Sequence, residues 1–193
     1  MRWLTLYARS RQMPASLAVV VLSAVAVWAL VARDGGGGPG DLKPAVFVLV
    51  AGVTAVSVGL GGQDVALDRT AAIPWRLRRA AHVLLIGTAV GAVLLAVQRL
   101  GGTDLAATAF VVRDCAGLMG LAALGAVVCG AQYAWTLPMA WLSFTVFAPP
   151  PTSTPTEVVT WLLLPPGTPA GTWTALVLTV AGTAAYAVAG PRR

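Results

Sequence analysis

Six apolar runs rich in Ala, Val, Leu and Gly, separated by short polar connections, dominate this chain. A membrane-spanning α-helix needs about 20 predominantly apolar residues, and five of the runs come close to that length. The sequence therefore predicts an all-α membrane protein with six transmembrane helices, which form a single transmembrane domain over residues 1–193. The expected spans cover residues 14–32, 43–60, 81–97, 105–128, 137–147 and 172–189.

Composition agrees with this interpretation. Hydrophobic residues make up 58% of the chain and charged residues only 10%, whereas soluble proteins carry about 25% charged residues. The net charge of +6 comes from short connections between apolar runs, so orientation in a membrane explains it better than nucleic-acid binding. The fifth run, residues 137–147, is the shortest and is marginal for a span.

The first thirteen residues mix Trp3, Leu4 and Tyr7 with three arginines. This amphipathic pattern predicts a helix over residues 1–13 that lies in the membrane interface, with its arginines toward anionic headgroups. A disordered basic N-terminus is the alternative.

A basic segment separates the second and third expected spans. Residues 61–80 hold four of the thirteen basic residues of the chain, Arg69, Arg76, Arg78 and Arg79. Lys and Arg are retained on the cytoplasmic side of membranes, and nine of the thirteen fall on one side if both termini are cytoplasmic. The charge pattern therefore predicts six spans with both termini cytoplasmic, in the plasma membrane of a bacterium.

A proline-bounded segment, residues 149–171, precedes the last span. Its apolar part, Thr156 to Leu164, has nine residues, too few to cross a bilayer. We expect a short re-entrant or interfacial helix there, with Thr156 as its N-cap and Glu157 in the first turn. Trp161 and Leu163 would face the bundle or the outer leaflet, and the helix would cap the exit side of a transport path. A passive interfacial anchor is the alternative.

One pair of charged residues, Arg113 and Asp114, stands inside the fourth apolar run. Ionisable residues at membrane depth are costly and face a protein interior or water. The pair therefore lies either near the outer headgroups or with one member lining a cavity or a subunit interface. The glycines that follow, Gly117, Gly120 and Gly125, predict a face for close helix contact.

The residues that an intramembrane enzyme requires are not found together. His82 has no evident nucleophile beside it, and Asp64 and Asp68 alone are a weak metal motif. No CxxC pair and no phosphate-binding loop of the GxxxxGK[ST] type occurs. Cys115 and Cys129 would lie about 21 Å apart on one helix, too far for a disulfide. We expect no enzymatic activity, no metal site and no cofactor in this chain.

The order of elements resembles the transmembrane subunit of an ABC-2-type exporter: an interfacial helix, two spans, a basic cytoplasmic loop, three spans, a short outer helix and a last span. The resemblance implies that the loop docks on a separate ATP-binding cassette subunit, which carries ATP and Mg²⁺. It also implies pairing with a second membrane subunit as a homodimer or heterodimer. The positions that match the docking loop are Asp64, Asp68, Arg69, Ile73, Trp75, Arg76, Arg78 and Arg79.

Three alternatives remain open from the residues. The basic segment is also typical of a solvated connector that only fixes topology. A substrate-binding membrane subunit of a vitamin importer has similar size and span number, and Arg113, Asp114 and Gln98 would supply part of its ligand cavity. A structural membrane protein without a transport role is the third.

Overall fold

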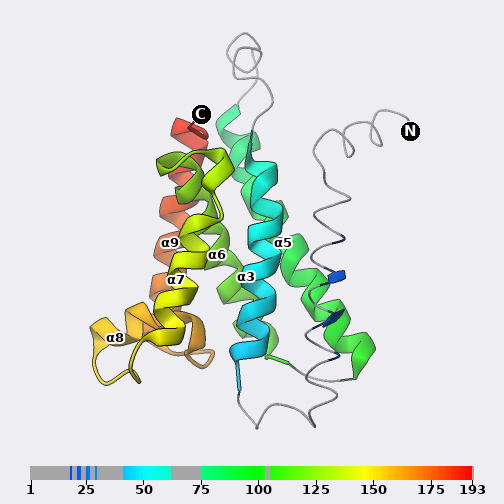
Figure 1. Cartoon of the computed structure of the whole chain (residues 1–193). Coiled ribbons are helices and arrows are strands. Elements are labelled where there is room, and N and C mark those ends of the chain that lie inside the picture. The colour runs from blue at the N-terminus through cyan, green and yellow to red at the C-terminus, as the bar shows by residue number, and fades with distance from the viewer. Residues whose placement is uncertain are drawn as a thin grey trace.

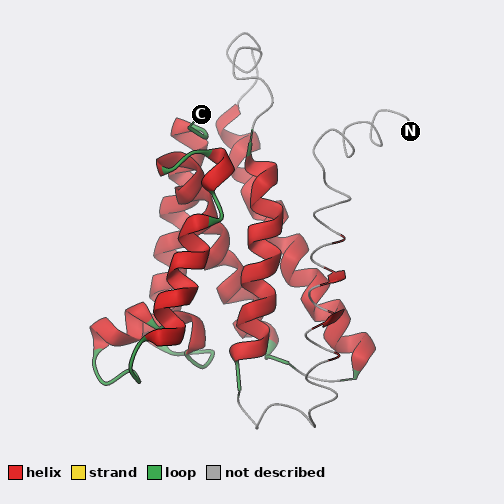
Figure 2. Cartoon of the chain, viewed as in Figure 1, coloured by secondary structure: helices red, strands yellow, loops and turns green. Residues whose placement is uncertain are grey.

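A computed structural model describes residues 41–61, 75–102 and 105–192, together with helical positions at 18, 21–22, 25–26 and 29. The described residues form helices and connecting turns and contain no strand (Figure 2). The α-helices are α3 (Lys43–Ser57), α5 (Trp75–Gly101), α6 (Thr108–Val128), α7 (Thr136–Phe147), α8 (Thr154–Val159) and α9 (Pro169–Ala189). Three short 3₁₀ helices join them, η1 (Val58–Leu60), η2 (Ala131–Tyr133) and η3 (Trp161–Leu163).

The five longer helices form an antiparallel bundle in which α3, α6 and α9 run one way and α5 and α7 the other (Figure 1). At one end, which we call the basic end, Tyr186 Oη of α9 donates to the Leu60 carbonyl at 2.6 Å, and the backbone N of Arg192 donates to the Ala126 carbonyl at 3.0 Å. At the other end, called the Trp161 end, Gln98 Nε2 donates to the Ala106 carbonyl at 2.8 Å and closes the connection from α5 to α6. The two bonds at the basic end join segments far apart in the chain, so they fix how the helix ends meet there.

Four helical segments are long and apolar enough to cross a membrane, so the prediction of an all-helical membrane protein is confirmed at this level. They are Lys43–Leu60, Trp75–Gly101, Thr108–Val128 and Pro169–Ala189. Their bounds follow the expected second, third, fourth and sixth spans, with one large difference, because α5 begins six residues before the expected Ala81. Residues 75–80 contain neither Gly nor Pro, so α5 includes the arginines of this stretch and begins directly after Pro74.

The fifth expected span corresponds to α7, which has 12 residues and is shorter than a bilayer core requires. It nevertheless runs between the same two ends as its neighbours in Figure 1. The described positions in the first expected span are helical. The interfacial helix expected over residues 1–13 lies outside the described residues. Because four helices among the described residues are long and apolar enough to span, the count of six spans stays a prediction.

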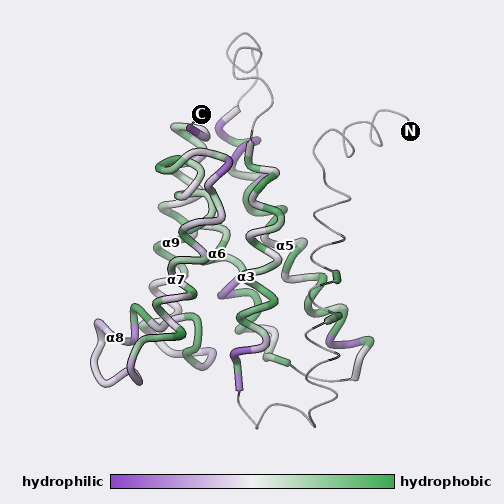
Figure 3. The backbone as a smooth tube through the Cα atoms, in the orientation of Figure 1, coloured by the Kyte–Doolittle hydropathy of each residue, from purple (hydrophilic) through white to green (hydrophobic). Residues whose placement is uncertain are grey.

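The core of the bundle is built around α6. In the most apolar stretch of α6, 72% of the residues are buried inside the protein, against 33% for α5 and 22% for α9. Phe110, Leu118, Ala122 and Ala126 are fully buried along α6. Apolar side chains cover the outside of α5 and α9, and hydrophilic residues gather near the helix ends (Figure 3). This pattern is typical of helices that face lipid rather than water.

Candidate functional site

The proline-bounded segment at the Trp161 end folds into α8 and η3. The helix begins at Thr154, two residues before the expected Thr156, because Ser153 takes the N-cap position and Pro155 fits the first turn. Thr156 instead completes a capping box, since its Oγ1 accepts a hydrogen bond from the Ser153 backbone N at 3.0 Å. Glu157 lies in the first turn, as expected. The N-cap prediction for Thr156 is therefore wrong by one helical turn, although the short helix exists.

The apolar half of this segment is inserted into the bundle. Trp161 and Leu162 are fully buried, and Leu163 is partly buried. The Trp161 ring lies against Gly117 of α6, where a side chain on that glycine would overlap the ring. The Ala175 Cα of α9 approaches the same glycine, so η3 is packed where α6 and α9 meet.

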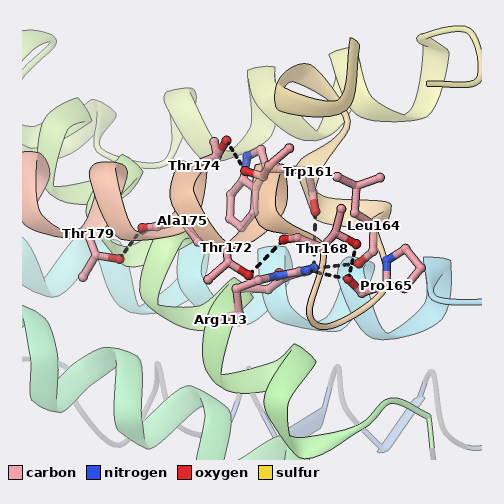
Figure 4. A network of polar contacts seen from close by, with 11 residues as sticks. Arg113, Trp161, Leu164, Pro165, Thr168, Thr172, Thr174, Ala175 and Thr179 are labelled. Atoms are coloured by element: carbon pink, nitrogen blue, oxygen red, sulfur yellow. Dashed lines mark hydrogen bonds and ion pairs between the residues drawn. The ribbon is translucent and has the colours of Figure 1, made fainter. Parts of the chain in front are cut away.

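Arg113 joins α6 to this segment (Figure 4). Its guanidinium donates from Nη1 to the Pro165 carbonyl at 3.0 Å, and from Nη2 to the Leu164 carbonyl at 2.8 Å and the Trp161 carbonyl at 3.3 Å. Nε donates to Asp114 Oδ1 at 2.8 Å. We call these five residues the Arg113 network. The Arg113 side chain is only 7% exposed and that of Asp114 is fully buried, so the pair faces the inside of the protein.

The chemistry of the segment explains why an arginine is needed. Pro165 and Pro166 have no backbone N–H and end the helix, so the carbonyls of this turn need other donors. The Trp161 carbonyl also accepts from the backbone N of Leu164, and the Pro165 carbonyl from Thr168, whereas the bond to the Leu164 carbonyl comes from Arg113. Unsatisfied backbone groups at membrane depth cost several kcal/mol each. The planar guanidinium offers five N–H donors on three nitrogens and reaches four acceptors here, whereas a lysine has three donors on a single nitrogen. Its cationic carbon also lies 5.1 Å from the centre of the Phe110 ring.

The network has one incompletely satisfied member. The second carboxylate oxygen of Asp114, Oδ2, is buried and accepts a hydrogen bond from none of the described residues. Arg113 is the partner that the structure gives to this carboxylate. The pair therefore packs inside the protein, while its depth in the membrane and any place at a subunit interface stay predictions. The long arginine side chain bends back to Asp114 and still reaches the segment fifty residues later.

The predicted docking residues divide into two groups. Asp64, Asp68, Arg69 and Ile73 lie outside the described residues, so their role stays a prediction. Trp75, Arg76, Arg78 and Arg79 form the first turns of α5 rather than a loop. The Arg78 guanidinium carbon lies 5.8 Å from the Trp75 ring centre, and Arg79 lies against Gly190 at the end of α9.

The structure also bears on the remaining candidate chemistry. Cys115 and Cys129 are free thiols, as their spacing predicted. Within the described part of the chain, no group of three His, Cys, Asp or Glu side chains could hold a metal ion. Gln98 and Arg113, considered as parts of a ligand cavity, are bonded within the chain. No sequence pattern predicts the bond between Tyr186 and Leu60, because an apolar span can hold a tyrosine at many depths.

A labelling experiment tests the burial of the η3 segment. In a Cys129→Ser background, a cysteine at position 163 should react with a membrane-impermeant maleimide at least tenfold more slowly than a cysteine at position 152. Leu163 is partly buried against the core, whereas Thr152 is exposed before the helix. The reaction rate is measured by mass shift on intact cells or vesicles. Equal rates at the two positions would contradict the packing described above.

No protein-family model, no curated protein and no solved structure matches this chain.

Proposed function

We propose that this protein is the transmembrane permease subunit of an ABC-2-type exporter in a bacterial cytoplasmic membrane. The observation that carries the proposal is the placement of two segments at opposite ends of one bundle. The α8–η3 segment, with η3 buried, lies at the Trp161 end, while α3 ends and α5 begins at the basic end (Figure 1). The basic segment over residues 61–80 follows α3 in the sequence and includes the start of α5. This is the order of elements on which the resemblance to ABC-2-type permeases rests.

Charge supports an orientation. Among the described residues, the basic end carries four arginines and no acidic residue, whereas the Trp161 end carries three basic and three acidic residues. The basic end therefore fits the cytoplasmic side, with both termini there and the α8–η3 segment outside. The basic-end arginines are Arg76, Arg78, Arg79 and Arg192; the residues at the other end are Asp41, Lys43, Arg99, Arg113, Asp114 and Glu157.

In this proposal this chain forms the transport path and a partner subunit hydrolyses ATP. ATP and Mg²⁺ would be held by a separate ATP-binding cassette subunit that docks on the basic end. A second membrane subunit, either another copy or a different chain, would complete the translocation path. The internal bonding of Arg113, Asp114 and Gln98 favours an exporter over the vitamin-importer alternative, which would direct such side chains into a ligand cavity.

Purification of the tagged chain from its native membrane, with any ATP-binding cassette subunit that co-purifies identified by mass spectrometry, tests the proposal. The double variant Asp68→Ala and Trp75→Ala should lower recovery of that partner at least tenfold and abolish stimulation of its ATPase activity. Trp75 is partly exposed at the start of α5, and buried aromatic anchors dominate interfaces of this kind. Trp173→Ala is the matched control, because Trp173 is 65% exposed but belongs to the start of α9 at the other end. Unchanged recovery and stimulation in the double variant would refute the docking.

A further inference from the structure

We propose that the basic end of the bundle binds one anionic phospholipid, whose phosphate lies at Arg76 near the start of α5 and whose acyl chain fills a groove between α5, α6 and α9. This inference concerns the chain alone and does not depend on the proposed transport function. The groove, the charges above it and the depth of the arginines each support it.

The groove is an apolar channel along the outside of the bundle with a volume of about 280 Å³. It follows α5 from Val83 to Leu95, a rise of about 18 Å and close to the thickness of one hydrocarbon leaflet. Thr88 and Thr179 line it, but their hydroxyls donate to the backbone of their own helices, at 2.8 Å and 2.6 Å. Such a surface fits a hydrocarbon chain. The remaining lining residues are Leu84, Gly87, Gly91, Ala92, Val112, Cys115, Ala116, Met119 and Thr183.

The arginines lie above the basic end of this groove. Arg76 precedes the lining residues Val83 and Gly87 by seven and eleven residues, which places it on the same face of α5. Gly190 follows Thr183 and Thr179 at the same two spacings, so it continues the groove-lining face of α9. Arg79 covers this point, since its Nη1 lies 2.8 Å from where a Cβ of Gly190 would be. Arg76 and Arg79, both from α5, therefore place positive charge above the α5 wall and above the point where the α9 wall ends.

One lining residue offers a polar group to the ligand. The hydroxyl of Thr183 is buried and bonds to none of the described residues. It is the lining residue of α9 nearest the basic end. A donor at that depth suits an ester carbonyl of a phospholipid, which lies just below the phosphate.

The length of α5 places the arginines among the headgroups. Its 27 residues span about 40 Å, which equals the thickness of a bilayer including both headgroup layers. The first turns of α5 therefore lie at phosphate depth rather than in bulk water. Trp75, at the very start, is the residue type that membranes hold at this level.

An anionic phospholipid satisfies both halves of the site. A helix from a second copy would fill the groove but would offer no counter-charge to Arg76. An acidic protein surface would meet the arginines but leave the groove open. Each basic residue near an anionic surface strengthens lipid binding by a factor of about five. We therefore expect clear selectivity for a lipid with a net negative headgroup.

Native mass spectrometry of the purified chain, titrated with dioleoyl phosphatidylglycerol or dioleoyl phosphatidylcholine, tests the site. Phosphatidylglycerol should bind at least tenfold more tightly than phosphatidylcholine. Arg76→Gln should weaken phosphatidylglycerol binding about fivefold, and Arg99→Gln, an exposed arginine at the other end of α5, should leave it unchanged. Thr183→Val should weaken binding of either lipid by a factor of about 2–10, the range for one lost hydrogen bond.

The acyl-chain half has its own matched pair. Ala92→Phe, which fills the groove, should weaken phosphatidylglycerol binding at least fivefold, while Ala89→Phe, an exposed position outside the lining, should not. All these positions except Thr183 are exposed, so folding should be kept. Equal binding of the two lipids, equal effects within either matched pair, or full displacement of phosphatidylglycerol by inorganic phosphate would each overturn the proposal.

Discussion

Replacing Arg113 with alanine should lower the free energy of unfolding by about 3–5 kcal/mol, the cost of removing one partner from a buried ion pair. The variant leaves the fully buried Asp114 without the partner that the structure provides. It also removes the donor of the Leu164 carbonyl and one of the donors of the Trp161 and Pro165 carbonyls. We expect the α8–η3 segment to detach first, because Arg113 is its main polar connection to α6.

Three further variants separate charge from shape. Arg113→Lys should recover only part of the loss, since an ammonium group cannot reproduce the fork that reaches four acceptors. The double variant Arg113→Ala with Asp114→Asn should be more stable than Arg113→Ala alone, because no unpaired charge remains buried. Arg99→Ala, an exposed arginine on α5, is the control and should change stability by less than about 0.5 kcal/mol.

Unfolding in detergent can be followed by tryptophan fluorescence, because Trp161 is fully buried in this network. The maleimide rate at position 163 gives a second, local readout. If Arg113→Ala unfolds like the Arg99→Ala control and position 163 stays protected, the network does not hold the segment.

Much of the architecture could be predicted because bilayer thickness limits how long an apolar helix must be. The spans beginning near Lys43, Thr108 and Pro169 were therefore found within a few residues of their observed bounds. The predicted start of the third span lies six residues after the observed start of α5, because a run of arginines is also typical of a loop. Arginine is a good helix former, and a helix can extend through the headgroup layer.

The Arg113 network could be predicted only in part. A charged pair in an apolar run indicates a buried partner, and the pair Pro165–Pro166 indicates carbonyls without donors. Nothing local in the sequence connects the two, because they are separated by about fifty residues. The groove was likewise missed, since three separate helices build it. The short helix was found from its prolines, but its cap at Ser153 was not.

The glycine face on α6 was predicted from sequence and is confirmed, although its partner was unknown. The most extensive helix contact in the bundle joins α6 and α9. A Cβ on Gly182 of α9 would overlap the backbone of Gly120, and one on Gly120 would overlap the backbone of Leu178. Gly117 is closed by Trp161 and Ala175, and Gly125 by the backbone of Ala134. α6 and α9 can therefore approach this closely only while Gly120 and Gly182 carry no side chain.

Gly182→Ala should consequently destabilise the protein, by about 1–3 kcal/mol as for other overpacked cores, and Gly182→Val by more. Helix propensity alone would favour alanine over glycine by about 1 kcal/mol, so a loss of stability would mean that steric overlap outweighs it. The overlapping atoms belong to the Gly120 backbone, which cannot rotate away as a side chain can. Gly59→Ala is the matched control, because nothing lies within 4 Å of its Cβ position. Thermal unfolding of the two variants in the same detergent compares their stabilities. A Gly182→Ala protein at least as stable as the Gly59→Ala protein would show that α6 and α9 can move apart without loss of stability.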